Sequence, residues 1–408
     1  MLSLFKEEKE YRKLFSAGVL NGIGDRFSQV AVLALLLELT GSGFAVGLTL
    51  AIRVIPFLLF APLGGWLSDK FSKRSILVLT DLIRIFFALS FLFVKSPDQV
   101  WIIYVGTFIL GAGEAIYAPA RKSIIPIIVN QYNLVKVNSL EQVMIGFILI
   151  GGSLSGGVAS YYLGPNITFG ANAVSFLLAA LILSRMQVKK ESVNEIISES
   201  TQRENTIAFL FSSSLLLLLL GSEFLIPLLN GIDNVLISVY AVEEFHLGDL
   251  GVGIFYGSLG IGLMLSFIVG ERLHNHLLII GFSVLIFEGL FLIILSEVHS
   301  VSIAVLVYIT IGFCAGVGGT CFDSTLMRIV PKNKQGSVFG LFATISNSMI
   351  GISMFGAGIA LEYADNRWLG MLGGAGFMVA GLLLLALYLS LKNNKDKMPS
   401  GRGTDVNA

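Results

Sequence analysis

Long apolar runs, separated by short polar segments, make up most of this chain of 408 residues. A helix needs about 20 apolar residues to cross the hydrocarbon layer of a membrane, and twelve runs reach that length. The pattern therefore predicts an all-α polytopic membrane protein with twelve transmembrane helices. We place these helices at residues 14–39, 43–66, 75–95, 100–120, 138–162, 166–186, 208–241, 248–270, 277–296, 301–326, 337–361 and 367–391.

The longest polar stretch extends from Gln187 to Asn205, between the sixth and seventh predicted helices. We therefore expect two six-helix halves, at residues 1–186 and 207–392, joined by a linker at residues 187–206. The final segment, residues 393–408, is polar and contains glycine, a composition typical of a disordered tail.

An internal repeat supports the two halves. The segment Gly111–Pro126 aligns without a gap on Gly316–Pro331, which matches predicted helix four to helix ten. A shorter echo matches Asn21-Gly22-Ile23 to Asn230-Gly231-Ile232, or helix one to helix seven. Repeats of this kind build transport sites near the midplane between the halves, and transport occurs by rocking of one half on the other. We expect an apolar cavity lined by helices one, four, seven and ten.

The distribution of Lys and Arg predicts the orientation in the membrane. Cytoplasmic loops carry an excess of these residues, and here the loops on the side opposite to the termini hold only Lys95 and Arg367. Both termini, the linker and the tail are therefore predicted to be cytoplasmic. The basic residues on their side include Lys6, Lys9, Arg12, Lys13, Arg121, Lys122, Lys136, Lys189, Lys190, Arg203, Arg272, Arg328, Lys332 and Lys334.

Composition excludes several classes of protein. Charged residues make up 13% of the chain and hydrophobic residues 55%, whereas soluble domains contain about 25% charged residues. The two cysteines, Cys314 and Cys321, form no metal or disulfide pattern, and we expect neither a metal nor a cofactor. No nucleotide-binding motif and no basic nucleic-acid surface is present, so transport driven by an ion gradient is favoured over ATP hydrolysis. A membrane-embedded enzyme would need an acidic, His-rich cluster at one interface, which the sequence lacks.

Ionisable residues within the spans are the first functional candidates, because the bilayer rejects them unless they are paired or hydrated. Asp25 lies inside helix one with Asn21 on the same face, and Arg53 lies at comparable depth in helix two. An Asp25–Arg53 ion pair would let protonation of Asp25 release the arginine. It could also be a permanent structural pair, and Arg26, about 100° away on helix one, is an alternative partner for Asp25.

Helices four and seven supply the other candidates. Glu114 stands on a Gly-x-Gly face of helix four with Arg121 seven residues further on, and is either a proton or cation site or a buried structural carboxylate. Its counterpart in the repeat is Gly319, so the halves are chemically unequal. Further candidates for the cavity are Tyr117, Glu223, Asn230 and Asp233, the last being either an external gate residue or a solvated helix end.

A charged hairpin separates predicted helices two and three. The segment Gly65-Trp-Leu-Ser-Asp69-Lys70-Phe-Ser72-Lys-Arg74 resembles the loop Gly-x-Leu-small-Asp-basic-x-Gly-basic-basic of the major facilitator superfamily, with Ser72 in place of a glycine. The resemblance implies that Asp69 caps the start of helix eleven and that Lys70, Arg74 and Arg121 belong to the cytoplasmic gate. The alternative to a gate is that these loop charges only set the orientation of the helices in the membrane.

The resemblance extends to a branch of this family. Gly152, Gly156 and Gly157 are similar to the second half of a helix-five motif of exporters, with Ser153 in place of proline. The segments Gly24-Asp25, Arg53-x-x-Pro56 and Tyr117-Ala-Pro-Ala-Arg121 resemble the macrolide-efflux and siderophore-export branch of bacterial drug-proton antiporters. Thr107 replaces an arginine of other antiporters, which excludes proton coupling through that residue.

The resemblance implies a monomeric multi-pass transporter of the bacterial cytoplasmic membrane. Its partners are the lipid bilayer, an amphiphilic drug-like substrate and, as the coupling ion, the proton. Export by proton antiport is the function we favour. The alternatives are an importer and a lysophospholipid flippase with the same fold.

Overall fold

The computed structural model describes residues 2–163, 165–188 and 206–396, and in this part of the chain the secondary structure is entirely helical. Twelve helices of the described chain are long and apolar enough to cross a membrane, with lengths of 19 to 32 residues. At 1.5 Å per residue the shortest is about 28 Å long, close to the thickness of the hydrocarbon layer. The prediction of an all-α polytopic protein with twelve spans is confirmed.

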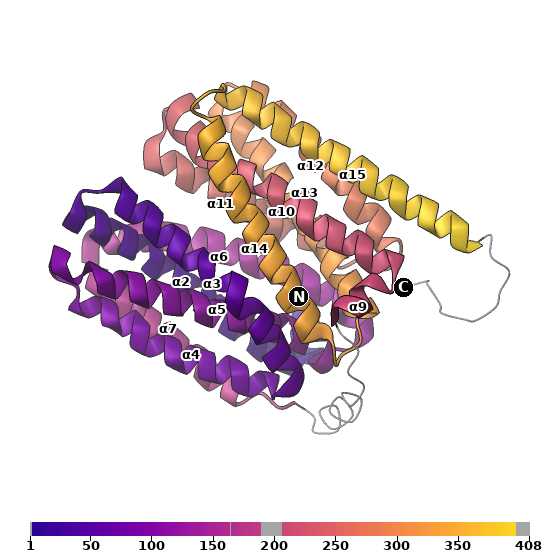
Figure 1. Cartoon of the computed structure of the whole chain (residues 1–408), viewed down its shortest axis with the longest axis horizontal. Helices are drawn as coiled ribbons and strands as arrows, with labels where there is room; N and C mark the ends of the chain where they lie inside the picture. Colours follow the sequence, from indigo (N-terminus) through magenta and orange to yellow (C-terminus); the bar gives the residue numbers. More distant parts are fainter. Residues whose placement is uncertain (1, 164, 189–205, 397–408) are drawn as a thin grey trace. The chain divides into compact units, whose positions relative to one another are not determined.

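The first six spans follow one another along the chain and are joined by short connections (Figure 1). A short α1 (Leu2–Glu7) precedes them, and the turns η1 (Phe91–Phe93), η2 (Pro97–Gln99) and η3 (Gln131–Asn133) lie in the connections. The spans themselves are α2 (Lys9–Thr40), α3 (Gly43–Lys70), α4 (Lys73–Ser90), α5 (Val100–Ile128), α6 (Leu134–Leu163) and α7 (Pro165–Ser184).

The last six spans are preceded by a short helix, which the sequence pattern did not distinguish from the seventh span. The predicted helix 208–241 is divided into α9 (Thr206–Phe211) and α10 (Ser214–Val239), because the serines between them bond locally, as Ser212 Oγ does to the carbonyl of Phe209 at 2.7 Å. A π-turn, η4 (Tyr240–Glu244), extends α10. The remaining spans are α11 (Gly248–Gly270), α12 (Leu277–Glu297), α13 (Val301–Ile329), α14 (Gln335–Ala360) and α15 (Asn366–Asp396).

The chain forms two compact units. The first contains residues 1–130, 147–202 and 331–348, and the second contains residues 131–146, 203–330 and 349–408, so α6 and α14 each contribute to both. The halves predicted at 1–186 and 207–392 stay a prediction, and most of the predicted linker and tail, 189–205 and 397–408, lies outside the described residues.

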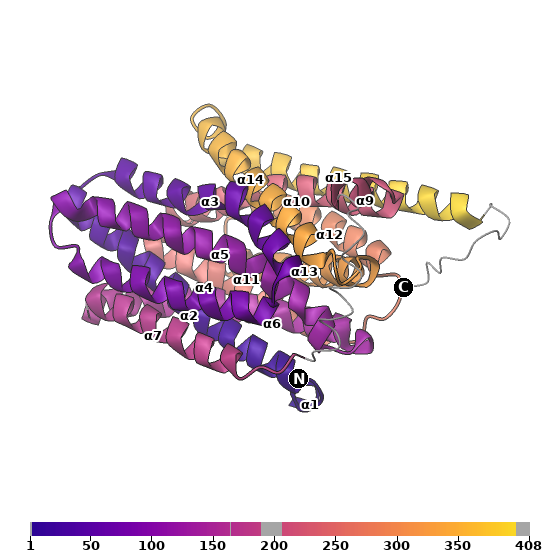
Figure 2. The ribbon, with the colours of Figure 1, turned by 60° about the horizontal axis from the view of Figure 1, so that its bottom comes forward.

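Helix packing within each unit repeats. In the first unit α2 packs on α7, α3 on α5, and α4 on both α5 and α7, as both views of the ribbon show for α4 and α7 (Figure 2). In the second unit α10 packs on α15, α11 on α13, and α12 on both α13 and α15. Each pair of the first unit thus has its counterpart six spans later.

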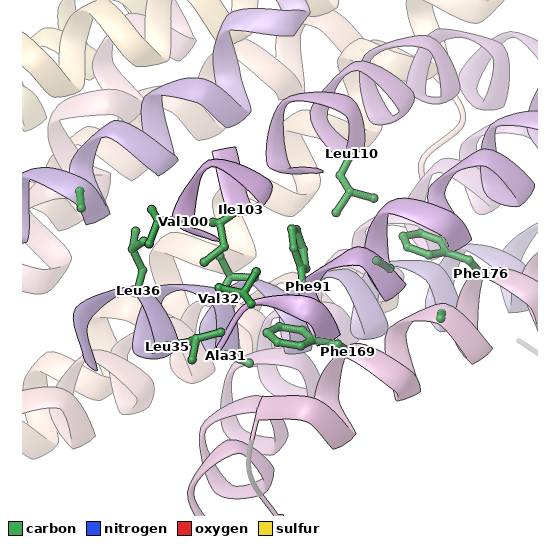
Figure 3. Close-up of a cluster of buried hydrophobic side chains, with 14 residues drawn as sticks. Ala31, Val32, Leu35, Leu36, Phe91, Val100, Ile103, Leu110, Phe169 and Phe176 are labelled. Carbon is green, nitrogen blue, oxygen red and sulfur yellow. The ribbon is translucent and has the colours of Figure 1, made fainter. Parts of the chain in front are cut away.

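An apolar core fills the first unit between α2, α4, α5 and α7 (Figure 3). The rings of Phe91 and Phe169 meet edge to face at its centre, with centroids 5.3 Å apart. This packing holds the four helices together on one side of Asp25 and so fixes the helix faces on which the polar residues lie. Its buried members include Ala31, Val32, Leu35, Leu36, Val100, Ile103, Leu110 and Phe176.

Candidate functional site

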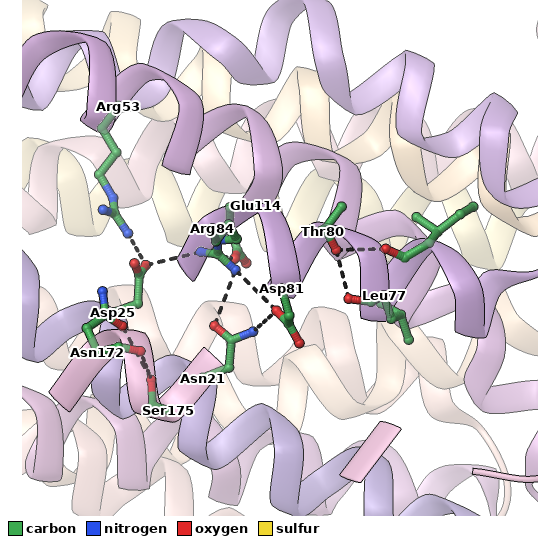
Figure 4. A network of polar contacts seen from close by, with 11 residues as sticks. Asn21, Asp25, Arg53, Leu77, Thr80, Asp81, Arg84, Glu114, Asn172 and Ser175 are labelled. Carbon is green, nitrogen blue, oxygen red and sulfur yellow. Dashed lines mark hydrogen bonds and ion pairs between the residues drawn. The ribbon is translucent and has the colours of Figure 1, made fainter. Parts of the chain in front are cut away.

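Five ionisable side chains meet within the first unit, inside membrane-spanning helices (Figure 4). Asp25 comes from α2, Arg53 from α3, Asp81 and Arg84 from α4, and Glu114 from α5. We call them the ionic network. Asp25, Arg53 and Glu114 were candidates from the sequence, and the structure brings all three together.

Arg84 lies at the centre of the ionic network. Its side chain is fully buried, and its Nη2 lies 2.9 Å from Glu114 Oε2 and 3.6 Å from Asp25 Oδ2. Its Nη1 lies 3.9 Å from Asp81 Oδ1, one helical turn earlier on α4. The planar guanidinium offers five N–H donors, so one side chain can face acids on three helices at once.

A polar and an aromatic side chain complete the surroundings of Arg84. Asn21 Nδ2 donates to Asp81 Oδ1 at 2.8 Å, and Arg84 Nη1 donates to Asn21 Oδ1 at 3.2 Å. The face that Asn21 shares with Asp25 therefore points at α4. The ring of Phe176 from α7 lies 4.4 Å from the guanidinium carbon of Arg84, within the range of a cation–π contact.

The second arginine, Arg53, forms an ion pair with Asp25 through its Nη2. This is the pair expected from the depth of the two residues in α2 and α3. Arg26, the alternative partner, has an exposed side chain and acts on Asp25 more weakly than Arg53 and Arg84 do. The side chain of Arg26 instead packs beside Gly152, where a Cβ would lie 2.6 Å from the Cβ of Arg26.

Small residues on α5 let the neighbouring helices approach the ionic network. A Cβ on Gly113 would lie 3.0 Å from both Cγ and Cδ of Arg84, and a Cβ on Gly111 would lie 2.6 Å from the carbonyl oxygen of Arg53. Gly111 thus receives α3 and Gly113 receives α4 on different sides of α5, because only glycine leaves space for the two arginine-bearing helices.

A small cavity of about 20 Å³ lies beside the Asp25–Arg53 pair. It has room for a water molecule and is far smaller than the about 300–1,000 Å³ of pockets for drug-sized ligands, so a substrate could enter only after the helices move. Its wall is mainly apolar, with a few polar groups: Ser28, Gln29, Thr49 and Thr107. Thr107, which replaces the arginine of other antiporters, therefore faces the same cavity as Asp25.

The other candidates on α5 lie beside the ionic network. Tyr117 is buried, and its hydroxyl has no hydrogen-bond partner among the described residues. Arg121 is also buried, one turn further on, within electrostatic range of Tyr117. Glu114 differs from both, because 36% of its side chain is exposed.

Asp81 and Arg84 were not among the candidates predicted from the sequence. Both lie within the predicted span 75–95, and both are fully buried. The signal that could have revealed them was the one applied to Asp25: an ionisable residue inside an apolar run is a functional candidate. Their spacing of three residues also places them on one helix face.

The charged hairpin contacts the first turn of α14, within the first unit. Asp69 accepts hydrogen bonds from the backbone N–H groups of Gly336 at 2.8 Å and Ser337 at 2.7 Å, and from Ser337 Oγ at 2.5 Å. A Cβ on Gly65 would overlap the carbonyl oxygen of Gly336, so glycine is required for this close approach. The cap implied by the family resemblance is therefore present; its role as a gate stays a prediction.

The basic residues of the hairpin contact residues of α3 and α7. Lys70 Nζ lies 4.1 Å above the ring of Trp66, and Arg74 donates to the carbonyl of Ser184 at the end of α7. Lys73 donates to the carbonyl of Ser68 at 2.7 Å. Ser72, at the position where the family has glycine, has φ −59° and caps α4, so no left-handed turn is needed.

The remaining sequence candidates lie on α6 and α10. Gly156 and Gly157 belong to α6, but their surroundings lie outside the described side chains. Glu223 and Asn230 on α10 are half-buried. Asp233 lines a small cavity of about 10 Å³ in the second unit together with Tyr240 and Phe377.

A further acid, Glu288 on α12, was also missed from the sequence. It is buried and lies within electrostatic range of Asp233. Neither acid forms an ion pair with any described residue. The second unit thus holds an acidic pair, where the first unit holds a network that contains two arginines.

The sequence profile of the Major Facilitator Superfamily matches residues 14–354. The chain belongs to this superfamily. It is therefore a transporter and not an enzyme, and superfamily members move small molecules across membranes. Membership rests on most of the chain and does not depend on the charged hairpin alone.

Two curated proteins are similar to this chain along most of its length, and a third over less than half of it. The uncharacterised MFS-type transporter YfiS of Bacillus subtilis is 21% identical over 398 residues, 95% of this chain and 93% of YfiS. The class H tetracycline resistance protein of Pasteurella multocida is 25% identical over 366 residues, 86% of this chain and 88% of that protein. The lysophospholipid transporter LplT of Cronobacter sakazakii is 29% identical over 179 residues, 42% of this chain and 44% of LplT.

Solved structures show the same fold. The human organic anion transporter MFSD10 superposes with a TM-score of 0.76 at 15% identity, covering 92% of this chain and 99% of that one. A bacterial homologue of the iron transporter ferroportin, in its outward-facing state, gives a TM-score of 0.72 at 18% identity, with 93% and 99% covered. At these identities the likeness establishes the superfamily fold alone.

Proposed function

We propose that this protein exports an amphiphilic organic compound across the bacterial cytoplasmic membrane in exchange for protons. The observation that carries the proposal is the ionic network: five ionisable side chains packed among apolar helices, beside a cavity whose wall is mainly apolar. Burial of an ionisable group inside a membrane protein is unfavourable, so such groups are rare there. Those that are present mark ion and substrate pathways.

The geometry supports an exchange of partners within the ionic network. Asp25 faces both Arg53 and Arg84, and Glu114 faces Arg84. Protonation of either acid removes its attraction for the arginine, so the arginine can turn to another acid or to a substrate. Arg26 is too exposed to take this part, and Asp233 and Glu288 offer a second acidic location in the other unit.

The contact between the hairpin and α14 suits a gate. We propose that Asp69 and Gly65 hold the start of α14 on the cytoplasmic side, and that the cap breaks when that side opens. Lys70, Arg74 and Arg121 would then be available for new partners. A single carboxylate with three donors is strong enough to favour one state and weak enough to be released, since such a cap contributes about 0.5–2 kcal/mol.

The direction of transport is supported by the relatives. Two tetracycline resistance proteins, of class H and class E, are 25% and 23% identical over 86% and 87% of this chain. The helix-five glycines and the resemblance to the macrolide-efflux and siderophore-export branch also favour export. The apolar cavity wall suits lipophilic compounds better than sugars, which need many polar partners.

Proteoliposomes with an acidic lumen test the proposal. We would add tetracycline, a macrolide, a siderophore and a cationic dye in turn and follow lumenal pH with a trapped indicator. At least one compound should trigger proton release, and Asp25→Asn and Glu114→Gln should abolish it. A surface variant, Asp98→Asn, should behave like the wild type. If none of the compounds moves protons in the wild type, antiport of this substrate class is wrong.

Lysophospholipid transport is the second candidate function, since LplT is 29% identical over 42% of this chain. The same vesicles distinguish it. A fluorescent lysophospholipid that crosses without a pH gradient, while the four test compounds leave lumenal pH unchanged, would favour this function over export.

A further inference from the structure

The ionic network contains one more acid than base. The two arginines, Arg53 and Arg84, face three carboxyl groups, Asp25, Asp81 and Glu114. With every group ionised, two positive and three negative charges leave a net charge of −1. Burying an uncompensated charge is so unfavourable that the group takes up a proton instead.

The three acids differ in how well their negative charge is compensated. Asp25 has the ion pair with Arg53 and a second arginine 3.6 Å away. Glu114 is the acid nearest to Arg84, at 2.9 Å, and 36% of its side chain is exposed.

Asp81 is the least compensated of the three. Its side chain is fully buried and its Oδ1 lies 3.9 Å from Arg84 Nη1. Oδ1 accepts one hydrogen bond from Asn21, whereas Oδ2 has no hydrogen-bond partner among the described residues. A buried carboxylate oxygen without a donor is unfavourable, but the same oxygen carrying a proton is neutral.

We propose that Asp81 is a proton-binding site, with the proton on Oδ2 while Oδ1 keeps its hydrogen bond from Asn21. Only an O–H bond forms or breaks at this site. The use of this proton in transport rests on the antiport function proposed above; its presence rests on the geometry of the ionic network alone.

The elements packed around Asp81 carry groups that favour or oppose its ionisation. On its own helix, Arg84 favours ionisation of Asp81, and the hydrogen bond from Asn21 on α2 favours it too. Glu114 on α5 and Asp25 on α2 oppose it, and α7, residues 165–184, carries no ionisable side chain. The position of Arg84 therefore controls the proton: while Glu114 holds the guanidinium, Asp81 stays protonated.

This arrangement gives a mechanism for coupling. A cationic compound or a proton at Glu114 would release Arg84, which could then move towards Asp81 and stabilise its ionised form. The proton would leave Oδ2 for water that reaches the ionic network at the exposed side of Glu114. Binding at Glu114 and proton loss at Asp81 would thus be linked through one side chain.

Infrared difference spectroscopy of the purified full-length protein at neutral pH tests the assignment without any substrate. Asp233→Asn/Glu288→Gln should be the background, because these buried acids could contribute their own signal. The carbonyl band of a protonated carboxyl group should shift when aspartate carries ¹³C at its carboxyl carbon and should not shift with labelled glutamate. Asp81→Asn should abolish the band, and Asp98→Asn should leave it unchanged.

Asp81→Glu identifies the residue that carries the proton even if Asp81→Asn fails to fold. In this variant the band should follow the glutamate label. A band that still follows labelled aspartate in Asp81→Glu, or a band of the Asp233→Asn/Glu288→Gln background that follows labelled glutamate, would place the proton on another acid; either result overturns the proposal. If the band behaves as expected but no compound releases protons from vesicles, the proton site stands and its part in antiport is wrong.

Discussion

A single guanidinium organises the candidate site. Arg84 has no exposed surface and faces Asp25, Asp81 and Glu114 from one position. Lysine could not replace it, because an ammonium is a compact point charge and lacks the planar fork that reaches several acids.

Loss of Arg84 should destabilise the fold, and removal of an acid should compensate. With Asp81 protonated, Arg84→Gln leaves Arg53 to face two carboxylates, and breaking a buried ion pair costs about 3–5 kcal/mol. We expect a lower unfolding temperature in detergent, measured by tryptophan fluorescence, with a partial recovery in Arg84→Gln/Glu114→Gln. Arg84→Lys should lie between Arg84→Gln and the wild type. An Arg84→Gln variant as stable as the wild type would contradict the central role of this residue.

The cap of α14 depends on one carboxylate at the end of α3. Asp69→Ala removes three hydrogen bonds and should lower the free energy of unfolding by about 0.5–2 kcal/mol. Asp69→Asn keeps one acceptor oxygen and should lose less. Asp98→Ala, which removes an exposed carboxylate near the start of α5, is the matched control. Equal thermal stability of Asp69→Ala and Asp98→Ala would show that the cap contributes nothing to the folded state.

At the level of helices, the internal repeat has a physical basis in glycine contacts. Gly22 packs against Ile148 of α6 in the first unit, and Gly231, its match in the repeat, packs against Ser353 of α14 in the second. The α3–α5 and α11–α13 pairs also correspond. The short echo between helices one and seven therefore marks equivalent points of close helix approach.

Two glycines on α11 should respond in opposite directions to the same substitution. A Cβ on Gly262 would overlap the carbonyl oxygen of Ile309 on α13, whereas a Cβ on Gly257 meets nothing within 4 Å. Gly262→Ala should destabilise the protein by about 1–3 kcal/mol through overpacking. Gly257→Ala should stabilise the helix by about 0.5–1 kcal/mol, because alanine is the better helix former. Thermal unfolding of both variants in one detergent checks the signs; a stable Gly262→Ala would mean that α11 and α13 can separate freely.

The sequence predicted the helices better than it predicted their contacts. Hydropathy located all twelve spans, because lipid imposes length and apolarity on each helix separately. The Asp25–Arg53 pair could be predicted since each residue is conspicuous and both lie at one depth. The role of Arg84 could not, because its position among three acids depends on how α4 packs on α5 and α7, which no single span encodes.

At the scale of the whole molecule, the side of the membrane that the charged hairpin faces decides which entrance its cap on α14 would close. The excess of Lys and Arg on one set of connections predicts that side to be the cytoplasm. In this orientation the cap of Asp69 on α14 would be the inner gate, while the proton gradient sets the direction of exchange.

Single cysteines can determine the orientation. The native thiols, Cys314 and Cys321, are buried in α13 and can be replaced by serine to give a background without thiols. In intact cells a membrane-impermeant maleimide should label Asp98→Cys, on the connection before α5, and should leave Asn275→Cys, on the connection between α11 and α12, unlabelled. Both positions are exposed, so permeabilised cells should label both and thereby control for reactivity. The reverse pattern would place the hairpin outside the cell, and the cap of Asp69 on α14 would then close the outer entrance, whereas the direction of exchange would still follow the proton gradient.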